Sequence, residues 1–433
     1  MNPIIAILWF LIFSKLLLFW LWLWQLKEYH LGRFKAHFEG QWFKKIISSF
    51  WRQKYPKFTK KIILIFLISL ATEILLFFYF SFPRVIILTI FFIPLLVLSF
   101  QIPASIWRKI IINKAEAKRA EFKNLLVIGI AGSYGKTSTK EILATILSEK
   151  FKVLKTTEHQ NSEVGISQCI LDNLKPEHEI FVVEMGAYNR EGIELLCNIA
   201  KPKIGILTGI NEQHLATFGS LEKIIKTKYE LIENLPEDGT AFFNAKNKYC
   251  LELYEQTRIK KNLYGEEAAF SGGENVLGAI AVAGELGMSG EEISRAVEKI
   301  ENKMPGIQIK KGINGLIIID ATYSANPDGV LAHLEYFKKN PGKKIIVMPC
   351  LIELGKAAEK VHKKIGQKIG EVCDLAIITT KDKFEEIKKG APDALFMENP
   401  REIFEKIKFF CREGDMVLLE SRVPSELIDL LLK

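Results

Sequence analysis

The hydrophobic pattern changes character along this chain of 433 residues. Residues 4–24, 62–80 and 85–105 are nearly continuous runs of Leu, Ile, Phe and Trp, each long enough to cross a bilayer as a helix. From residue 125 onward, short apolar runs alternate with segments whose apolar residues recur at helical spacing. The first pattern predicts three transmembrane helices within residues 1–123, and the second predicts an α/β region behind them.

The distribution of charge gives the three predicted spans an orientation. The segment between the first two spans is rich in basic residues, namely Lys27, Arg33, Lys35, Lys44, Lys45, Arg52, Lys54, Lys57, Lys60 and Lys61. By the positive-inside rule this loop is cytoplasmic, so the N-terminus is outside and the third span delivers the rest of the chain to the cytoplasm. Much of the formal net charge of +9 lies in this loop, where topology and attraction to anionic lipid explain it, and nucleic-acid binding is not needed.

Two charged residues interrupt the apolar runs. Lys15 lies within the first predicted span and Glu73 within the second, at similar depths. Since an unpaired ion inside a bilayer is costly, we predict a contact between Lys15 and Glu73; transport of protons or substrate is the alternative. The six cysteines are scattered without metal-binding spacing, which is typical of reduced residues.

Eight apolar runs after residue 124 have the length and composition of buried strands. These predicted strands are 125–131, 181–184, 204–208, 241–244, 316–320, 344–348, 375–379 and 416–419. Their alternation with amphipathic helices predicts parallel α/β sheets. Pro305 and Gly306 mark the predicted joint between a larger domain, residues 124–303, and a smaller Rossmann-like α/β domain, residues 304–433.

A phosphate-binding pattern follows the first of these strands: Gly132, Ser133, Tyr134, Gly135, Lys136, Thr137 and Ser138. Glycines let backbone N–H groups approach phosphate oxygens, Lys136 can reach the terminal phosphates, and Thr137 can ligate magnesium. A standard Walker loop would have glycine where this chain has Ile130, so the motif is the shorter Gly-x-x-Gly-Lys-Thr variant. An isolated Gly-Lys-Thr is often coincidental, but a strand before it and a helix after it favour a domain that binds a nucleoside triphosphate.

Three more candidate residues stand near the carboxyl ends of the next strands, where open α/β sheets bind ligands. Glu184 ends one strand, His214 follows the next, and Lys228 lies on the helix after it. Glu184 beside a phosphate loop is a reasonable magnesium ligand. His214 alone would more often be structural, and Lys228 alone would be a solvated lysine.

Taken together, these stretches resemble the Mur ligases of bacterial peptidoglycan synthesis, and within them the branch that adds D-alanyl-D-alanine. The matching segments, in family order, are 132–140, 184–187, 214–220 with Lys228, 235–240 with Asn244 and Ala245, 320–328, and 353–355. The resemblance implies a ligase that uses ATP to phosphorylate a substrate carboxylate and then forms an amide with an incoming amine. It covers residues 125–433.

The resemblance also implies roles for individual residues. Lys136, His214 and Lys228 would be catalytic, and the nucleotide would be bound by Gly132, Ser133, Gly135, Lys136, Thr137, Ser138, Asn275, Asp320 and Asn326. Thr137 and Glu184 would hold one magnesium ion and His214 a second, with Lys228 as a carbamylated lysine ligand. Asp320 would contact the ribose, although Asn326 and the residues after it also have the pattern of a turn and helix start.

The chain departs from the family at several positions, and these departures leave alternatives open. Ile307, Gly278 and Gly209 stand where the family has an arginine and two asparagines, and the predicted spans replace the family's usual first domain. We therefore expect a multi-pass protein of the bacterial cell membrane that ligates a small-molecule or lipid-linked muramoyl-peptide to an amino acid or dipeptide. A ligase for another acceptor, such as polyglutamate, and a degenerate nucleotide-binding membrane scaffold are the alternatives.

Overall fold

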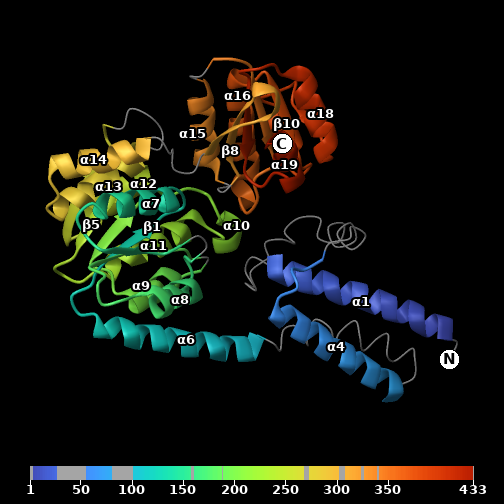
Figure 1. Cartoon of the computed structure of the whole chain (residues 1–433), viewed down its shortest axis with the longest axis horizontal. Coiled ribbons are helices and arrows are strands. Elements are labelled where there is room, and N and C mark those ends of the chain that lie inside the picture. The colour runs from blue at the N-terminus through green and yellow to red at the C-terminus, as the bar shows by residue number, and fades with distance from the viewer. Residues whose placement is uncertain are drawn as a thin grey trace. The chain divides into compact units, whose positions relative to one another are not determined.

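The computed structural model of this chain describes residues 3–26, 55–79, 101–157, 160–187, 189–267, 273–301, 308–322, 326–338 and 341–432. It divides into two compact units, Met1–Asn113 and Lys114–Lys433. The first unit contains helices, and the second contains two α/β sheets with their own helical layers (Figure 1).

Two helices, α1 (Pro3–Leu26) and α4 (Lys60–Tyr79), pack together in the first unit. Phe13, Leu17 and Leu21 of α1 meet Ile62 and Ile65 of α4 in a buried apolar cluster. A third helix, α6 (Gln101–Glu121), begins in the first unit and ends in the second.

The structure does not support the expected transmembrane helices. Within the residues that the structure describes, no helix combines the length and the apolar character needed to cross a membrane. The run in α1 contains four tryptophans and Lys15, and α4 carries Lys60, Lys61 and Glu73. The third expected span, residues 85–105, lies almost entirely outside the described residues. The expected location as a multi-pass protein of a bacterial membrane, with the N-terminus outside, is therefore withdrawn.

Glu73 has a partner that the hydrophobic pattern did not suggest. The Oε1 atom of Glu73 accepts a hydrogen bond of 2.9 Å from the indole Nε1 of Trp9, and Glu73 is 3% exposed. This bond links α1 and α4 and satisfies one oxygen of a buried carboxylate. The predicted contact between Lys15 and Glu73 stays a prediction.

The first sheet of the second unit has six parallel strands in the order β2-β3-β1-β4-β5-β6. Its strands are β1 (Leu126–Ala131), β2 (Val153–Lys155), β3 (Ile180–Glu184), β4 (Ile204–Leu207), β5 (Thr240–Asn244) and β6 (Lys260–Tyr264). The four central strands are almost wholly buried, as expected for parallel strands that are covered by helices on both faces.

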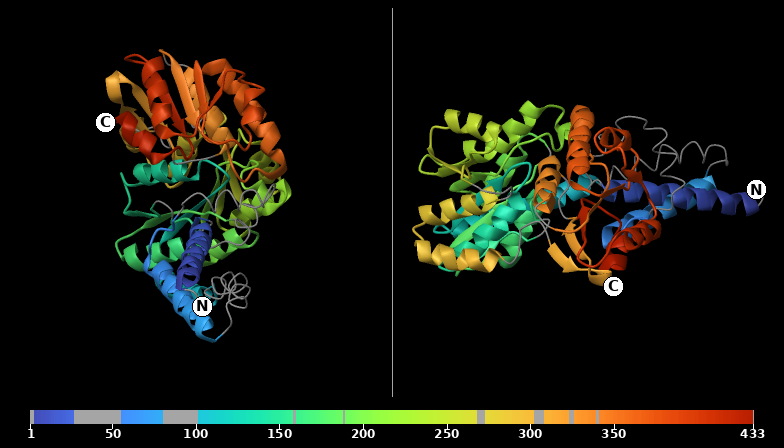
Figure 2. Two further views of the ribbon diagram at one scale, coloured as in Figure 1. Left: turned by 90° about the vertical axis from the view of Figure 1, so that its right-hand side faces the viewer. Right: turned by 90° about the horizontal axis from the view of Figure 1, so that it is seen from above.

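Helices cover both faces of this sheet (Figure 2). One layer consists of α7 (Lys136–Leu147), α13 (Gly273–Glu285) and α14 (Gly290–Glu301), and the other of α8 (Glu163–Asn173), α9 (Gly192–Ala200) and α11 (Leu221–Glu233). The short α10 (Leu215–Phe218) precedes α11, and α12 (Lys248–Gln256) links β5 to β6. Apolar residues of α7 and α13 form one buried cluster with those of the strands.

The second sheet has the order β11-β10-β9-β12-β8-β7 and is parallel except for the β7–β8 pair. Its strands are β7 (Gln308–Lys311), β8 (Ile317–Ala321), β9 (Lys344–Met348), β10 (Leu375–Ile378), β11 (Leu395–Phe396) and β12 (Met416–Glu420). One face is covered by α15 (Pro327–Lys338), α16 (Ala358–Val372) and α17 (Phe384–Lys388), and the other by α18 (Pro400–Phe410) and α19 (Ser425–Leu432). The predicted α/β class with two parallel sheets is confirmed, and the predicted joint at Pro305 lies outside the described residues.

The strand register brings three candidate segments to one edge of the first sheet. Ile130 pairs with Glu184 on one side of β1, and Ala131 pairs with Leu207 on the other. The loop after β1 is therefore flanked by the carboxyl ends of β3 and β4. This edge is where open α/β sheets bind their ligands.

Candidate functional site

A glycine-rich loop, Gly132–Gly135, joins β1 to α7. Gly135 has a φ of 76°, and a Cβ atom there would lie 2.6 Å from Oδ1 of Asn275, so both its conformation and its surroundings require glycine. No side chain caps α7 at Gly135, and the N–H groups of the first helical turn have no acceptor within the helix. Such a helix start favours an anion.

Contacts with the next strand fix the shape of this loop. The amide of Ser133 donates to the carbonyl of Gly209 at 2.7 Å, and the hydroxyl of Thr208 donates to the carbonyl of Tyr134. The Ser133 hydroxyl in turn accepts from the amide of Asn211 at 3.2 Å. The loop is thus braced by the segment that follows β4.

Lys136 folds back over the loop that precedes it. Its Nζ atom donates to the carbonyl oxygen of Gly132 at 2.9 Å. Desolvation lowers the pKa of Lys136, and the nearby Glu184 carboxylate opposes that shift. The ammonium group therefore sits at the loop, as the sequence predicts for a group that would contact phosphates.

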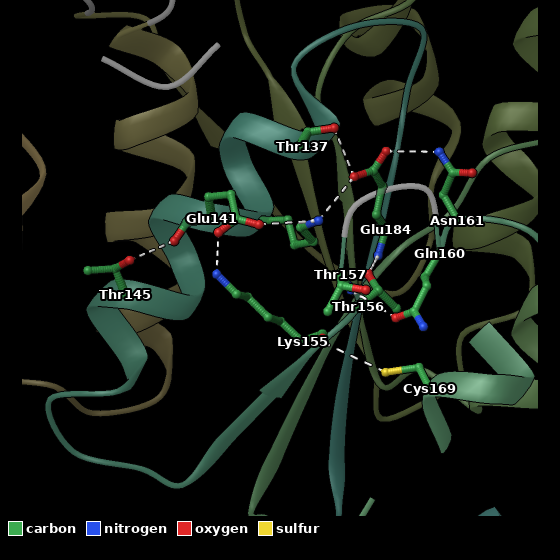
Figure 3. A network of polar contacts seen from close by, with 11 residues as sticks. Thr137, Glu141, Thr145, Lys155, Thr156, Thr157, Gln160, Asn161, Cys169 and Glu184 are labelled. Carbon is green, nitrogen blue, oxygen red and sulfur yellow. Dashed lines mark hydrogen bonds and ion pairs between the residues drawn. The ribbon is translucent and has the colours of Figure 1, made fainter. Parts of the chain in front are cut away.

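Thr137 and Glu184 face one another at the carboxyl edge of the sheet (Figure 3). The Thr137 hydroxyl donates to Oε2 of Glu184 at 2.9 Å, while Nδ2 of Asn161 donates to Oε1 at 3.1 Å. The Glu184 amide donates to the Thr156 hydroxyl at 3.1 Å. The Thr137 hydroxyl and the Glu184 carboxylate, oxygen ligands of the kind that magnesium prefers, thus lie together. Asn161, which sequence reasoning missed, orients the carboxylate.

The charge of Glu184 is set by its neighbours. Burial alone would raise the pKa of Glu184, but the ammonium groups of Lys136 and Lys140, together with its two side-chain hydrogen bonds, hold the pKa below its usual value. The carboxylate is therefore ionised and able to bind a cation at neutral pH.

His214 is held by a residue of the second sheet's domain. Its Nδ1 atom lies 2.6 Å from Oε2 of Glu353, and the amide of Ala216 donates to the Glu353 carbonyl at 3.1 Å. Burial, with contributions from Lys228 and Lys136, lowers the pKa of His214 even though the Glu353 contact opposes the shift. A neutral imidazole is the form that ligates metals.

Lys228 is a buried lysine without a carboxylate partner among the described hydrogen bonds and ion pairs. It is 3% exposed, and its Nζ atom donates to the carbonyl of Ala187 at 3.3 Å and lies 5.8 Å from the ring centre of Phe218. Burial, followed by repulsion from Lys136, lowers the pKa of Lys228 to about 7. The interpretation of Lys228 as a solvated lysine is therefore wrong for this structure.

The electrostatic couplings show which candidates share one environment. Lys136 acts on the pKa values of Glu184, His214 and Lys228, and Lys228 also acts on His214. These four side chains come from α7, β3, the loop after β4, and α11. The structure therefore gathers them around the glycine loop, and Ser138 lies on the first turn of α7 beside it.

Asn275 and two of the departures from the family pattern have packing explanations. Oδ1 of Asn275 accepts from the Thr139 hydroxyl at 3.1 Å, so this side chain braces α7. The ring of Tyr134 fills the space beside Gly209, and the ring of Tyr264 lies 2.7 Å from where a Cβ of Gly278 would be. Tyrosine rings thus occupy the space at both glycines, whereas Ile307 lies outside the described residues.

Asp320 and Asn326 belong to the second sheet's domain. Asp320 pairs with Lys310 at 2.7 Å and accepts from the Thr322 hydroxyl at 2.6 Å. Oδ1 of Asn326 accepts from the Gly329 amide at 2.8 Å, which is the helix-start role that the sequence allowed. Their contact with a nucleotide stays a prediction.

A second polar contact joins the two sheet domains. Nδ2 of Asn211 donates to Oδ2 of Asp328 at 2.6 Å. Burial raises the pKa of Asp328, and this hydrogen bond opposes the shift. Asp328 lies in the first turn of α15, so the contact ties the start of that helix to the loop after β4.

Comparison with known proteins matches this architecture to two domain families. Residues 130–293 match the Mur ligase middle domain, and residues 307–422 match the Mur ligase glutamate ligase domain, which is its C-terminal part. The chain belongs to the Mur ligase family. The glycine loop and the Thr137–Glu184 pair lie in the middle domain, and Asp320 and Glu353 lie in the C-terminal domain.

Similar proteins include enzymes named for one reaction of this family. The chain is 30% identical over 269 residues to the UDP-N-acetylmuramoyl-tripeptide--D-alanyl-D-alanine ligase of Synechocystis, a match covering 56% of this chain and 59% of that protein. This chain therefore matches about three fifths of that relative's length.

Solved structures agree with that family assignment. The MurF ligase of Thermotoga maritima, in complex with ADP, has a TM-score of 0.66 and 26% identity, over 75% of this chain and 83% of that one. MurF from Acinetobacter baumannii, at 23% identity and a TM-score of 0.68 over 75% and 80% of the two chains, shares the fold.

The donor set around Glu184 fits magnesium better than a metal held by protein ligands alone. In the described ranges, no three His, Cys, Asp or Glu side chains converge closely enough to hold a metal ion. Magnesium in nucleotide sites takes one or two protein oxygens and completes its shell with phosphate and water. The Thr137 hydroxyl and the Glu184 carboxylate are such a pair.

Proposed function

We propose that this protein is an ATP-dependent ligase that joins D-alanyl-D-alanine, or a related amine, to a muramoyl-peptide. The observation that carries the proposal is the grouping of Lys136, the Thr137–Glu184 pair, His214 and Lys228 around one glycine loop. A nucleotide-binding scaffold would have no physical need for a neutral imidazole and a deprotonable buried lysine beside that loop.

The nucleotide phosphates would be held by the Gly132–Gly135 loop, the first-turn N–H groups of α7 and the Lys136 ammonium. Ser133 and Ser138 flank this anion site, and Asn275 keeps Gly135 and α7 in place. Asp320 and Asn326, from the C-terminal domain, would contribute to the ribose side. These assignments follow from the shape of the loop and the family resemblance.

Thr137 and Glu184 would hold one magnesium ion, and His214 with Lys228 a second. Magnesium, when bound, neutralises phosphate charge and orients the group that is transferred. The protein's own part is positional: Asn161 and Thr137 fix the two carboxylate oxygens, and Glu353 fixes the His214 ring.

Lys228 has the properties that carbamylation requires. Only a neutral amine attacks carbon dioxide, and a pKa of about 7 leaves a large neutral fraction at neutral pH. The amine adds to the carbon of carbon dioxide and releases one proton, which converts a cation into an anionic oxygen ligand. Repulsion between Lys228 and Lys136 would become attraction, which favours the modified form.

The reaction would proceed in two balanced steps. A substrate carboxylate oxygen attacks the γ-phosphorus of ATP, which releases ADP and forms an acyl phosphate. The incoming amine then attacks the acyl carbon, loses a proton and displaces inorganic phosphate. Because charge is redistributed over phosphate oxygens in the first step, the fixed cation Lys136 would contribute to catalysis by electrostatics and positioning.

The choice of substrates rests on the names of the relatives. Enzymes named as UDP-N-acetylmuramoyl-tripeptide--D-alanyl-D-alanine ligases match this chain at 27–30% identity, although over 59–61% of the lengths of the first three. Ligation to D-alanyl-D-alanine is therefore the reading with the most support. Other acceptors remain for experiment to separate.

The test is a product assay with the full chain, ATP, magnesium, UDP-N-acetylmuramoyl-tripeptide and D-alanyl-D-alanine. We expect amide product by mass spectrometry together with equal amounts of ADP. Lys136→Met should abolish the product, whereas the matched change Lys155→Met, at a partly exposed lysine of β2, should not. Product only with a glutamate-type acceptor would reassign the substrate. Absence of product with every acceptor, with or without nucleotide binding, would indicate a scaffold.

A further inference from the structure

One buried charge beside the proposed site has no part in the reaction as described above. Lys140 lies on α7 one helical turn after Lys136 and is fully buried, with an exposed fraction of 0%. Its Nζ atom lies 3.5 Å from Oε2 of Glu184 and 3.3 Å from Oε1 of Glu141. Within the described residues, this Nζ atom has no hydrogen-bond partner.

The two carboxylates beside Lys140 differ in their surroundings. The Glu184 side chain is 7% exposed, whereas Glu141 is 42% exposed and also pairs with Lys155. The result is a row of alternating charges, Glu184, Lys140, Glu141 and Lys155, from a buried carboxylate to a partly exposed lysine. Figure 3 labels Glu184, Glu141 and Lys155. The buried end of this row is the proposed magnesium ligand.

A buried ammonium with no hydrogen bond is costly and persists only where an opposite charge compensates it. Here the compensating group is the carboxylate oxygen that Thr137 also contacts. The ammonium of Lys140, a residue of α7, therefore lies where a cation would neutralise the Glu184 carboxylate. A divalent ion shared by Thr137 and Glu184 would approach the same oxygen, so the two positive charges would repel one another.

We propose that Lys140 is a positioning residue that acts as the counter-ion of Glu184 in the metal-free protein. When magnesium and nucleotide bind, the metal replaces the Lys140 ammonium as the counter-ion of Glu184, and the ammonium stays paired with Glu141. Lys140 thus keeps the site folded without metal and weakens metal binding. This inference rests on the proposed function, because it takes Glu184 to be a magnesium ligand.

The experiment compares thermal unfolding of the full chain in three conditions: EDTA alone, ADP with EDTA, and ADP with magnesium. The rise in Tm between the last two conditions, called the magnesium increment, measures the effect of the metal alone. We expect Lys140→Met to lose roughly 10 °C in EDTA, because Glu184 loses its buried counter-ion. Magnesium should then restore most of that loss, so its increment should be about twofold or more larger than in the wild type.

Two further variants separate charge from packing. Lys155→Met makes the same substitution at the exposed end of the same row and should keep the wild-type magnesium increment. Lys140→Arg keeps the positive charge and should also keep the wild-type magnesium increment. If Lys140→Met does not fold, Lys140→Gln takes its place with the same expectation.

A merely structural Lys140 would give a different pattern. The variant would then lose stability equally with and without magnesium, and an unchanged increment overturns the inference while leaving the proposed function intact. A wild-type protein with no magnesium increment in the presence of ADP would instead remove the proposed metal site, and this inference with it. Direct titration with manganese should show about tenfold tighter binding to Lys140→Met in the presence of ADP.

Discussion

Nδ1 of His214 lies 2.6 Å from Oε2 of Glu353, and this contact joins the middle domain to the C-terminal domain. Both residues have positive φ angles, 65° and 66°, so each backbone adopts a conformation that needs support from its surroundings. A carboxylate on one ring nitrogen fixes the tautomer and the orientation of a metal-binding histidine. The proposed second metal site would therefore be complete only when the two domains are together.

Loss of this carboxylate should weaken metal binding. Glu353→Ala should raise the magnesium concentration needed for half-maximal ATP turnover by about 10–100-fold, because the His214 ring loses its orienting partner. Glu353→Gln should restore part of the effect, since its amide oxygen can still accept from Nδ1. The control is Glu359→Ala in the same domain, an exposed residue paired with Lys383. A magnesium dependence equal to that of the control would refute the orienting role.

Removal of the Lys228 side chain should abolish activity in a way that a small acid can repair. Lys228→Ala leaves a space where a short carboxylic acid can supply the oxygen ligand that the carbamate would have provided. We expect activity to fall by at least about 100-fold and to recover partly with acetate or propionate. Carbon-13 NMR of the wild type in labelled bicarbonate should show a carbamate signal that the variant lacks. Activity that is lost without rescue, and no such signal, would count against carbamylation.

The low pKa of Lys228 should also appear in stability. The side chain titrates at about 7 in the folded protein and near 10.5 in the unfolded chain. Below pH 7 both states are protonated, and the cost of the buried ammonium is fully present. Between about 7 and 10.5 the unfolded chain binds more protons than the folded one, so stability rises with pH.

This titration can be isolated by urea unfolding in buffer free of carbon dioxide and magnesium. Lys228→Met should be more stable than the wild type at pH 6, and its advantage should shrink as the pH rises towards 10. A difference between the two proteins that is independent of pH would contradict the lowered pKa of Lys228.

The tyrosine beside Gly278 should make this position intolerant of the family's asparagine. Gly278→Asn would place a Cβ atom 2.7 Å from the ring of Tyr264. We expect a loss of about 1–3 kcal/mol in the free energy of unfolding from overpacking. Gly284→Asn on the same helix is the control, because nothing lies within 4 Å of its Cβ position. Equal changes at the two positions in a urea titration would show that the Tyr264 ring does not cause the loss.

The fold was readable from the sequence where strands are buried. The eight predicted strands match β1, β3, β4, β5, β8, β9, β10 and β12, whose residues are nearly all apolar. The strands that the pattern missed, β2, β6, β7 and β11, are the edge strands of the two sheets. Edge strands are short or half-exposed, as Lys260–Tyr264 and Gln308–Lys311 illustrate, so they lack the apolar signal.

The N-terminal region shows the opposite failure. Composition predicted transmembrane helices where the structure has α1 and α4. One face of each helix packs in a shared apolar cluster, while other apolar residues of both helices, such as Leu11 and Leu75, are exposed.

The candidate site was predictable where a sequence motif indicates the chemistry of its residues. Lys136, Thr137, Glu184, His214 and Lys228 were all selected from spacing and resemblance, and they share one environment in the structure. Other groups in that environment were not assigned a role. Asn161 follows a loop with no motif of its own, and Glu353 reaches His214 across 139 positions of sequence. Lys140 looks like any helix lysine until its burial is known.

The central claim is that the site transfers the γ-phosphoryl group of ATP to a substrate carboxylate before an amide forms. The most direct measurement uses muramoyl-tripeptide labelled with oxygen-18 in the reacting carboxylate, with D-alanyl-D-alanine, ATP and magnesium, and mass spectrometry of the products. An acyl phosphate predicts that each inorganic phosphate released with the amide carries one labelled oxygen from that carboxylate. Unlabelled phosphate, or label recovered in AMP, would contradict the proposed ligase chemistry.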